Sequence, residues 1–360
     1  MAMPTKEQIL EALRDVQDPE IHKSIVDLNM VRDIRVCGGQ VSVTVALTIR
    51  GCPLRDEFQR MITERLLEMP DVTDVDVKLT EMTPEERQAL FGGDKLQKVP
   101  ILSPDSPTQV IGVASGKGGV GKSTVTVNLA AALRRMGYAV GVLDADIYGF
   151  SVPRMLGLDG KPTAIEGKIM PMPAYGLKVI SMGNFVDNNQ PVIWRGPMLG
   201  KVLQQFLTDV LWGDLDYLLL DLPPGTGDVA LDVARMIPKS NILVVTTPQT
   251  VASGVASRAA HMATKANQKL IGVVENMSYF LCPDCGKATP IFGEGGGQAL
   301  ADELGVELLG QIPLTVALRE GSDRGKPIVF QEGAENDPAR QAVEALARRV
   351  AALCPVPVRN

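Results

Sequence analysis

Apolar and polar residues follow one pattern in residues 1–81 and another from residue 109 onward. In residues 1–81, apolar positions at helical spacing are followed by two alternating runs, Val31–Val36 and Val41–Leu47. Gly38 and Gly39 lie between these runs, which is typical of a hairpin. A second helical run and a closing strand complete the segment. We expect residues 1–81 to form a small α+β domain with the element order α-β-β-α-β.

The pattern changes after this segment. Residues 82–108 keep no long periodicity and are interrupted by glycines and prolines, so they predict a linker. Residues 109–360 repeat apolar strand, turn and helix, which predicts an α/β domain. Its strands are apolar without alternation, as expected for a mostly parallel, doubly wound sheet that helices cover on both faces. The predicted strands are Val110–Ala114, Ala139–Leu143, Lys178–Ser181, Tyr217–Leu220, Ile242–Thr246, Leu270–Val274 and Glu307–Gly310.

A glycine-rich loop follows the first of these strands and precedes a predicted helix. It reads Gly116-Lys117-Gly118-Gly119-Val120-Gly121-Lys122-Ser123-Thr124 and fits the phosphate-binding pattern G-x-x-x-x-G-K-[ST]. Glycines let backbone N–H groups converge on phosphate oxygens. Lys122 adds a positive charge near the β and γ phosphates, and the Ser123 hydroxyl is suited to Mg²⁺. We therefore expect a P-loop NTPase that binds and hydrolyses ATP with Mg²⁺, with Lys122 as a catalytic residue.

Carboxylates end two later strands of the same domain. Asp221 ends the apolar run that begins at Tyr217, which is the Walker B pattern, and we expect it to hold Mg²⁺ and support catalysis. Asp146 is the candidate for orienting the attacking water, with Asp144 in support. The alternative for both is helix capping or loop solvation. The segment 223–228 suits a loop that senses the γ-phosphate.

The base of the nucleotide has one candidate contact. No Asn-Lys-x-Asp guanine signature stands near the later strands, which favours ATP over GTP. The run 274–277 is expected to end a strand, where Asn276 can offer its amide to the adenine edge.

Cys282 and Cys285 form a C-x-x-C pair, and a metal centre held by cysteine usually needs four thiolates. The sequence has no second C-x-x-C, and its two histidines, His22 and His261, are distant from this pair. A complete site then requires two subunits. Lys117, a second lysine inside the phosphate loop, resembles the deviant Walker A subgroup, in which it reaches the partner's phosphates. That resemblance independently implies an ATP-sandwich homodimer.

Together the motifs resemble the Mrp/ApbC family of iron–sulfur cluster carrier ATPases, relatives of MinD and ParA. The family implies a [4Fe–4S] cluster bridged between two protomers by Cys282 and Cys285 and passed to apo iron–sulfur client proteins, with cluster assembly factors as further partners. Phe150 departs from the family, which usually has proline there. Residues 1–81 resemble the PaaD-like unit often fused in front. The segments that carry the resemblance are 117–124, 144–149, 194–197, 220–228, 275–278, 282–285, 18–20 and 48–53.

Composition narrows the alternatives. A net charge of −6 and a pI near 5.2 argue against a broad nucleic-acid or membrane surface, so neither is expected as a partner. Five scattered cysteines and a polar N-terminus without an apolar run favour a cytoplasmic protein. Cys37 and Cys354 are expected to be incidental, whereas Cys52 could be a reactive thiol or a buried one.

Three other functions remain open from the residues. The first is a MinD/ParA-like positioning ATPase, which the acidic pI disfavours. The second is a zinc-stapled dimeric ATPase, because four thiolates suit zinc as well as an iron–sulfur cluster. The third is a dithiol redox pair, which lacks thioredoxin-like surroundings.

Overall fold

The computed structural model describes residues 4–18, 23–47, 55–83, 86, 101–103, 105–146, 149–165, 167–185, 196–225, 233, 235–249, 257, 260, 264, 268–282 and 285–357. The chain divides into two compact units. The first comprises residues 1–98 with 164–168, and the second comprises residues 99–163 with 169–360. Within the described part of the chain, each helix is too short or too polar to span a bilayer.

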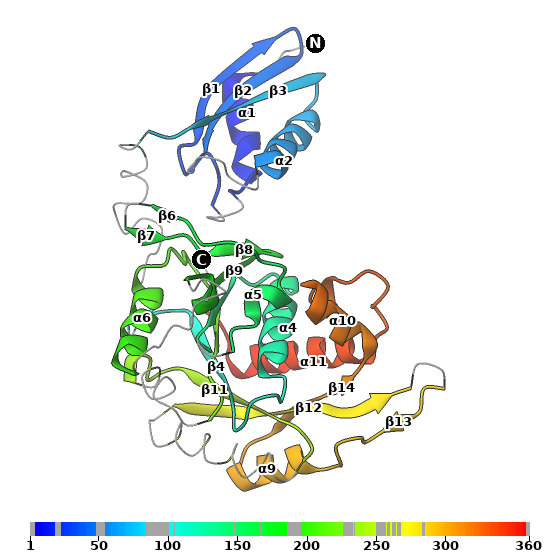
Figure 1. The fold of residues 1–360 in the computed structure, drawn as a ribbon. Helices are drawn as coiled ribbons and strands as arrows, with labels where there is room; N and C mark the ends of the chain where they lie inside the picture. The colour runs from blue at the N-terminus through cyan, green and yellow to red at the C-terminus, as the bar shows by residue number, and fades with distance from the viewer. Residues whose placement is uncertain are drawn as a thin grey trace. The chain divides into compact units, whose positions relative to one another are not determined.

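The first unit is a three-stranded sheet with two helices (Figure 1). Thr5 caps the first helix by accepting a hydrogen bond from the Gln8 backbone N–H, and the Gln8 side chain accepts one from Thr5 in return. The central strand lies antiparallel to one neighbour and parallel to the other. The predicted α+β order is confirmed. Its elements are α1 (Lys6–Ala12), η1 (Leu13–Asp15), β1 (Val31–Cys37), β2 (Gln40–Leu47), α2 (Arg55–Leu67) and β3 (Asp74–Glu81).

The second unit is built on a long sheet with the strand order β13-β12-β11-β4-β10-β5-β9-β8, in which β14 also pairs with β12. All its pairings are parallel except those of the two outer strands, β13 and β8. The mostly parallel sheet predicted from the apolar runs is confirmed. The strands are β4 (Gln109–Ser115), β5 (Val140–Asp144), β8 (Met172–Ala174), β9 (Leu177–Ser181), β10 (Tyr217–Asp221), β11 (Asn241–Thr246), β12 (Lys269–Leu281), β13 (Ala288–Thr289) and β14 (Leu308–Leu314).

Helices cover both faces of this sheet. On one face, alternate strand residues such as Val113 and Leu219 pack with apolar residues of α4 and α11. On the other face, their neighbours Leu218 and Leu220 pack with α6. The strands are therefore buried on both sides, which explains their continuous apolar sequence. The helices are α4 (Lys122–Arg135), α5 (Val152–Met155), η3 (Met182–Phe185), α6 (Gly196–Thr208), α9 (Gly296–Leu304), α10 (Val316–Arg324), η4 (Ile328–Phe330) and α11 (Pro338–Leu353). Two short strands, β6 (Ala164–Ile165) and β7 (Lys168–Ile169), form a separate sheet.

One strand is longer than the sequence predicted. The expectation that a strand ends at residues 274–277 was wrong, because β12 continues to Leu281. Pairing with β14 and β13 sustains it: Phe280 lies opposite both Leu314 and Thr289. Figure 1 shows the hairpin of β12 and β13 extending beyond the rest of the sheet.

Candidate nucleotide site and cysteine hairpin

The site begins where parallel strands end side by side. In the register of the sheet, Asp221 of β10 lies opposite Asp144 of β5, and Asp144 lies opposite Ser181 of β9. The phosphate loop follows β4, which is the other neighbour of β10. The carboxyl ends of these strands therefore gather both carboxylates and the loop at one edge of the sheet, the usual place for a ligand in such folds.

Lys122 is the positive charge at the centre of this edge. Its Nζ lies 2.8 Å from Asp221 Oδ1 and 3.4 Å from Asp146 Oδ2. The side chains of Lys122 and Asp221 are 6% and 0% exposed, and the Asp146 side chain is 11% exposed. Buried charges are tolerated when they are paired, so these contacts explain how the group remains inside the fold.

Two hydroxyl groups complete the surroundings of Asp221. Ser123 Oγ donates a hydrogen bond to Asp221 Oδ2 at 2.5 Å. Thr126 Oγ1, one helical turn further along α4, lies 2.9 Å from Asp221 Oδ1. A hydroxyl and a carboxylate that converge in this way are the hard oxygen ligands that Mg²⁺ prefers. The residues present therefore fit a magnesium ion beside the phosphates.

Asp144 is held from two sides. Its Oδ1 accepts a hydrogen bond from the Asp146 backbone N–H at 3.1 Å, and its Oδ2 accepts one from Ser181 Oγ at 2.9 Å. Burial, and after it the negative charge of Asp221, raises the pKa of Asp144 to about 8. Burial also raises the pKa of Asp146, although nearby Lys122 opposes this shift. Asp144 thus fixes the backbone from which Asp146 faces Lys122.

The loop backbone adopts the conformations that its glycines allow. Gly119 and Gly121 have φ values of 80° and 78°, in the left-handed region that favours glycine. Lys117 points to its own chain, where its Nζ donates to Gln249 Oε1 at 2.9 Å. Its reach to a partner's phosphates stays a prediction. The Gly225 backbone N–H, at the start of the segment expected to sense γ-phosphate, donates to the Ser115 carbonyl at 2.8 Å. Residues 226–228 of that segment lie outside the described residues.

Asn276 lies against the phosphate loop. The residue is 3% exposed, and its Nδ2 donates a hydrogen bond to the Val120 carbonyl at 2.9 Å. One amide N–H is therefore used to hold the loop backbone. A contact of Asn276 with adenine, expected from the sequence, stays a prediction.

Cys282 and Cys285 lie together in the turn between β12 and β13. The Cys282 backbone N–H donates to the Lys287 carbonyl at 3.1 Å, and the Gly286 N–H donates to the Cys282 carbonyl at 2.9 Å. Cys285 is exposed and Cys282 is half-buried. Among the described residues, no group of three or more Cys, His, Asp or Glu side chains is placed to hold a metal ion. This hairpin thus offers two thiols from one chain.

The other cysteines are apart from this turn. Cys37 is exposed in the first unit and Cys354 is buried after α11, where burial raises the pKa of its thiol. Cys52 lies outside the described residues.

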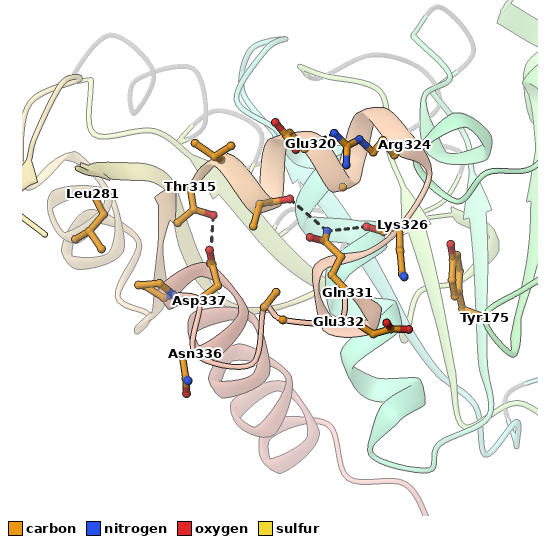
Figure 2. Close-up of a pocket in the computed structure, with 16 residues that line it drawn as sticks. Tyr175, Leu281, Thr315, Glu320, Arg324, Lys326, Gln331, Glu332, Asn336 and Asp337 are labelled. Atoms are coloured by element: carbon orange, nitrogen blue, oxygen red, sulfur yellow. Dashed lines mark hydrogen bonds and ion pairs between the residues drawn. The ribbon is translucent and has the colours of Figure 1, made fainter. Parts of the chain in front are cut away.

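A cavity of about 770 Å³ lies near the root of the cysteine hairpin (Figure 2). Leu281, the residue before Cys282, lines it together with residues of α10 and the N-terminal end of α11. Thr315 and Asp337, which are hydrogen-bonded to each other at 3.2 Å, line it beside Leu281. Its lining carries both basic and acidic side chains and includes no residue of the phosphate loop. The cavity is therefore separate from the nucleotide site.

Three residues of the nucleotide site were not predicted from the sequence: Thr126, Ser181 and Gln249. Ser181 ends the predicted strand 178–181, so the rule that carboxyl ends of parallel strands meet could have identified it. Thr126 lies one turn after Lys122 on the same helix, which is a second usable signal. For Gln249, which contacts Lys117 across 132 positions of sequence, we find no local signal.

Comparisons with known proteins find relatives of both segments of the chain. The family described as NUBPL iron-transfer P-loop NTPase matches residues 106–351, and the family described as iron-sulfur cluster assembly protein matches residues 6–79. An iron-sulfur cluster carrier protein of Mycobacterium leprae is 50% identical over 340 residues, which are 91% of this chain and 88% of that protein. One of Bacillus subtilis is 42% identical over 358 residues, covering 99% and 100% of the two chains.

Solved structures give the same fold. A nucleotide-binding protein of Archaeoglobus fulgidus, in complex with ADP, matches with a TM-score of 0.56 and 38% identity over 65% of this chain and 90% of its own. The septum site-determining protein MinD of Pyrococcus horikoshii has a TM-score of 0.52 and 23% identity, and it covers 70% of this chain and 100% of its own. At that identity, MinD supports the fold alone.

These matches confirm the resemblance found in the motifs. They cover both segments that the sequence separated, and several relatives span nearly the whole chain. They also confirm the predicted enzyme class, a P-loop ATPase. The chain belongs to the NUBPL iron-transfer P-loop NTPase family, whose full-length relatives named above are iron–sulfur cluster carrier proteins.

Proposed function

We propose that this protein is an ATP-dependent carrier in which two protomers hold one [4Fe–4S] cluster and pass it to apo-proteins. The observation that carries the proposal is the hairpin of Cys282 and Cys285. It offers two thiols from one chain, and no third Cys, His, Asp or Glu ligand joins them among the described residues. A four-iron cluster held by thiolates requires four, so a second copy of the chain supplies the other pair.

Hydrolysis of ATP is assigned to the buried charged group at the edge of the sheet. Lys122 binds the β and γ phosphates, and Asp146 orients the attacking water from a backbone that Asp144 fixes. Ser123 and Asp221 hold Mg²⁺, which neutralises charge on the phosphates when it is bound. Lys117 reaches the phosphates of the partner protomer. This assignment gives catalytic roles to Lys117, Lys122, Asp146 and Asp221.

The nucleotide is cradled by residues 116–124, with Asn276 behind the loop. Apo iron–sulfur proteins and cluster assembly factors are the proposed partners, because the relatives that match nearly the full chain are named as cluster carriers. The cluster is cargo here rather than a resident cofactor. Exposure of Cys285 suits such cargo, because a ligand that must be exchanged with a client has to be reachable.

Anaerobic reconstitution with iron and sulfide tests this proposal. The wild type is expected to bind iron and sulfide in equal amounts, about four of each per two chains, with the broad visible absorbance of such clusters. Cys285→Ala should lose most of this iron, because it removes two of four ligands in the dimer. Cys37→Ala is the matched control, since it removes an exposed cysteine of the other unit and should load like wild type.

Transfer is tested with the loaded wild type and an apo iron–sulfur protein as acceptor. Iron bound equally by Cys285→Ala and wild type would contradict the cysteine assignment. Zinc bound tightly without sulfide, and no cluster formed, would favour the zinc-stapled ATPase instead.

A further inference from the structure

Strand β12 contacts the phosphate loop and, six residues later, carries the cysteine hairpin. Asn276 donates its hydrogen bond to Val120 inside the loop. At Gly121, where the loop becomes α4, a side chain would collide with the Asn276 amide and would come within 3.4 Å of Met277 Cε. Asn276 and Met277 therefore pack against the loop at its last turn.

The backbone of β12 is irregular at this contact. Met277 has a φ of 55°, a left-handed conformation that is strained for a residue with a side chain. The pairing of β12 with β14 changes register between Asn276 and Phe280. Between the pairs Asn276–Ile312 and Phe280–Leu314, β12 advances four residues and β14 advances two. The extra residues form a bulge in β12, a feature that often stands beside functional sites and redirects a strand. Here it lies between the residue that holds the loop and the residues that precede the thiols.

Within the bulge and beyond it, hydrogen bonds hold β12 to its neighbouring strands as far as the hairpin. Ser278 Oγ donates to the Ile312 carbonyl of β14 at 3.1 Å. Leu281 pairs with Ala288, and the Cys282 N–H then bonds to Lys287. The six residue-to-residue steps from Asn276 to Cys282 span at most about 20 Å of extended chain. A movement of the loop must therefore be absorbed at Met277 or passed to the hairpin.

We propose that Asn276 and Met277 are positioning residues that couple the nucleotide state of the phosphate loop to the cysteine pair through β12. Phosphates that bind the loop N–H groups orient the Val120–Gly121 backbone, and Asn276 follows because it is bonded to that backbone. The bulge converts this shift into a new position of the hairpin. The inference deepens the proposed function, because it takes Cys282 and Cys285 as the ligands of the cargo. By linkage, nucleotide and cargo then influence each other's binding.

The test uses the reduced, metal-free full-length protein. The rate at which iodoacetamide alkylates Cys285 is measured by peptide mass spectrometry, without nucleotide and with saturating Mg-ADP. In the wild type, ADP is expected to change this rate at least about fivefold, the lower range of allosteric coupling. In Asn276→Ala, the two rates should become equal within about twofold, at an ADP concentration that a separate titration of this variant shows to be saturating.

Ser278→Ala is the matched control, because it removes a buried hydrogen bond of the same strand that is directed at β14. It should keep the wild-type ratio of rates. Met277→Gly is the second variant: glycine adopts the left-handed backbone freely, so the protein should fold, while the contact of Cε with the loop is lost. In this variant too, the ratio of the Cys285 alkylation rates with and without ADP should fall toward one.

If ADP left the alkylation rate of Cys285 in the wild type unchanged, the coupling would be overturned. The coupling would also be overturned if both Asn276→Ala and Met277→Gly kept the wild-type ratio of rates. If Ser278→Ala also lost the difference between the two rates, the effect would come from a general weakening of β12 and the coupling would be overturned. The readout needs no cluster. Failure of iron loading would therefore refute the proposed function without removing a nucleotide-dependent change at Cys285.

Discussion

At the scale of single residues, the nucleotide site gathers more negative than positive charge. Lys122 contacts Asp221 and Asp146, while Asp144 is completely buried beside them. Burial of a carboxylate without its own cation favours the protonated form, which is the physical reason for the raised pKa of Asp144. The hydroxyl of Ser181 offsets only part of this effect.

This arrangement predicts a pH-dependent stability that depends on Asp144. Its pKa is about 8 in the folded chain against an ordinary value of 3.8, so the folded state binds more protons between these pH values. The unfolding free energy should therefore fall as pH rises from about 4 to about 8, by up to a few kcal/mol from this group. In Asp144→Asn, which keeps an oxygen for the Asp146 N–H, that part of the fall should be absent.

Urea unfolding at pH 5 and pH 8, without nucleotide or Mg²⁺, measures the difference. The comparison between variant and wild type removes the contribution of Asp146, whose raised pKa acts in the same direction. Parallel pH profiles for the two proteins would contradict the environment described for Asp144.

At the scale of elements, the hairpin of β12 and β13 depends on one glycine. Gly286 has a φ of 69°, and a Cβ added there would meet no atom within 4 Å. A substitution at this position is therefore opposed by backbone strain and not by crowding. Since the Gly286 N–H also bonds to Cys282, the strain acts on the geometry of the thiol pair.

Gly286→Ala is expected to weaken retention of the reconstituted cluster about fivefold, because a left-handed alanine costs about 1 kcal/mol. Gly286→Asn should retain it better, since asparagine tolerates this conformation. The measurement is the chelator concentration that strips half of the bound iron anaerobically. Equal retention by the Ala and Asn variants would show that the turn conformation does not limit metal binding.

Some elements of the second unit were predictable from the sequence and others were not. Continuous apolar runs such as 110–114 and 217–220 predicted buried parallel strands, because period and burial are properties of the local sequence. The phosphate loop was recognisable because its motif is also a pattern of the local sequence. The continuation of β12 past Met277 was not, since its partners β13 and β14 follow it in the chain and pair through backbone groups.

Side-chain contacts in the site were likewise predictable only where a local sequence pattern placed the residues. Strand ends predicted Asp221 and Asp144 as members of one site, because the order of motifs indicated parallel strands. The bond from Asn276 to Val120 joins residues 156 positions apart. A sequence pattern holds no record of such a contact. The sequence therefore did not predict the Asn276 bond that holds the loop, and the contact of the same amide with adenine stays a prediction.

At the scale of the whole molecule, each chain carries half of what the proposed activity requires. The phosphate loop contains Lys117, whose described partner is Gln249 of its own chain and whose proposed target is the nucleotide of a second copy. The hairpin offers two thiols where a cluster needs four. Both requirements are met by one symmetric dimer, and this shared dependence is the central claim of our account.

The most direct test is the mass of the iron-loaded particle, measured by anaerobic sedimentation together with its iron content in the presence of ATP. Our account predicts a particle of two chains, each of 38.6 kDa, that holds about four irons and falls to single chains in Cys285→Ala when ATP is removed. A single chain that carries a complete four-iron cluster, or a dimer that forms with ATP but holds no iron, would contradict it.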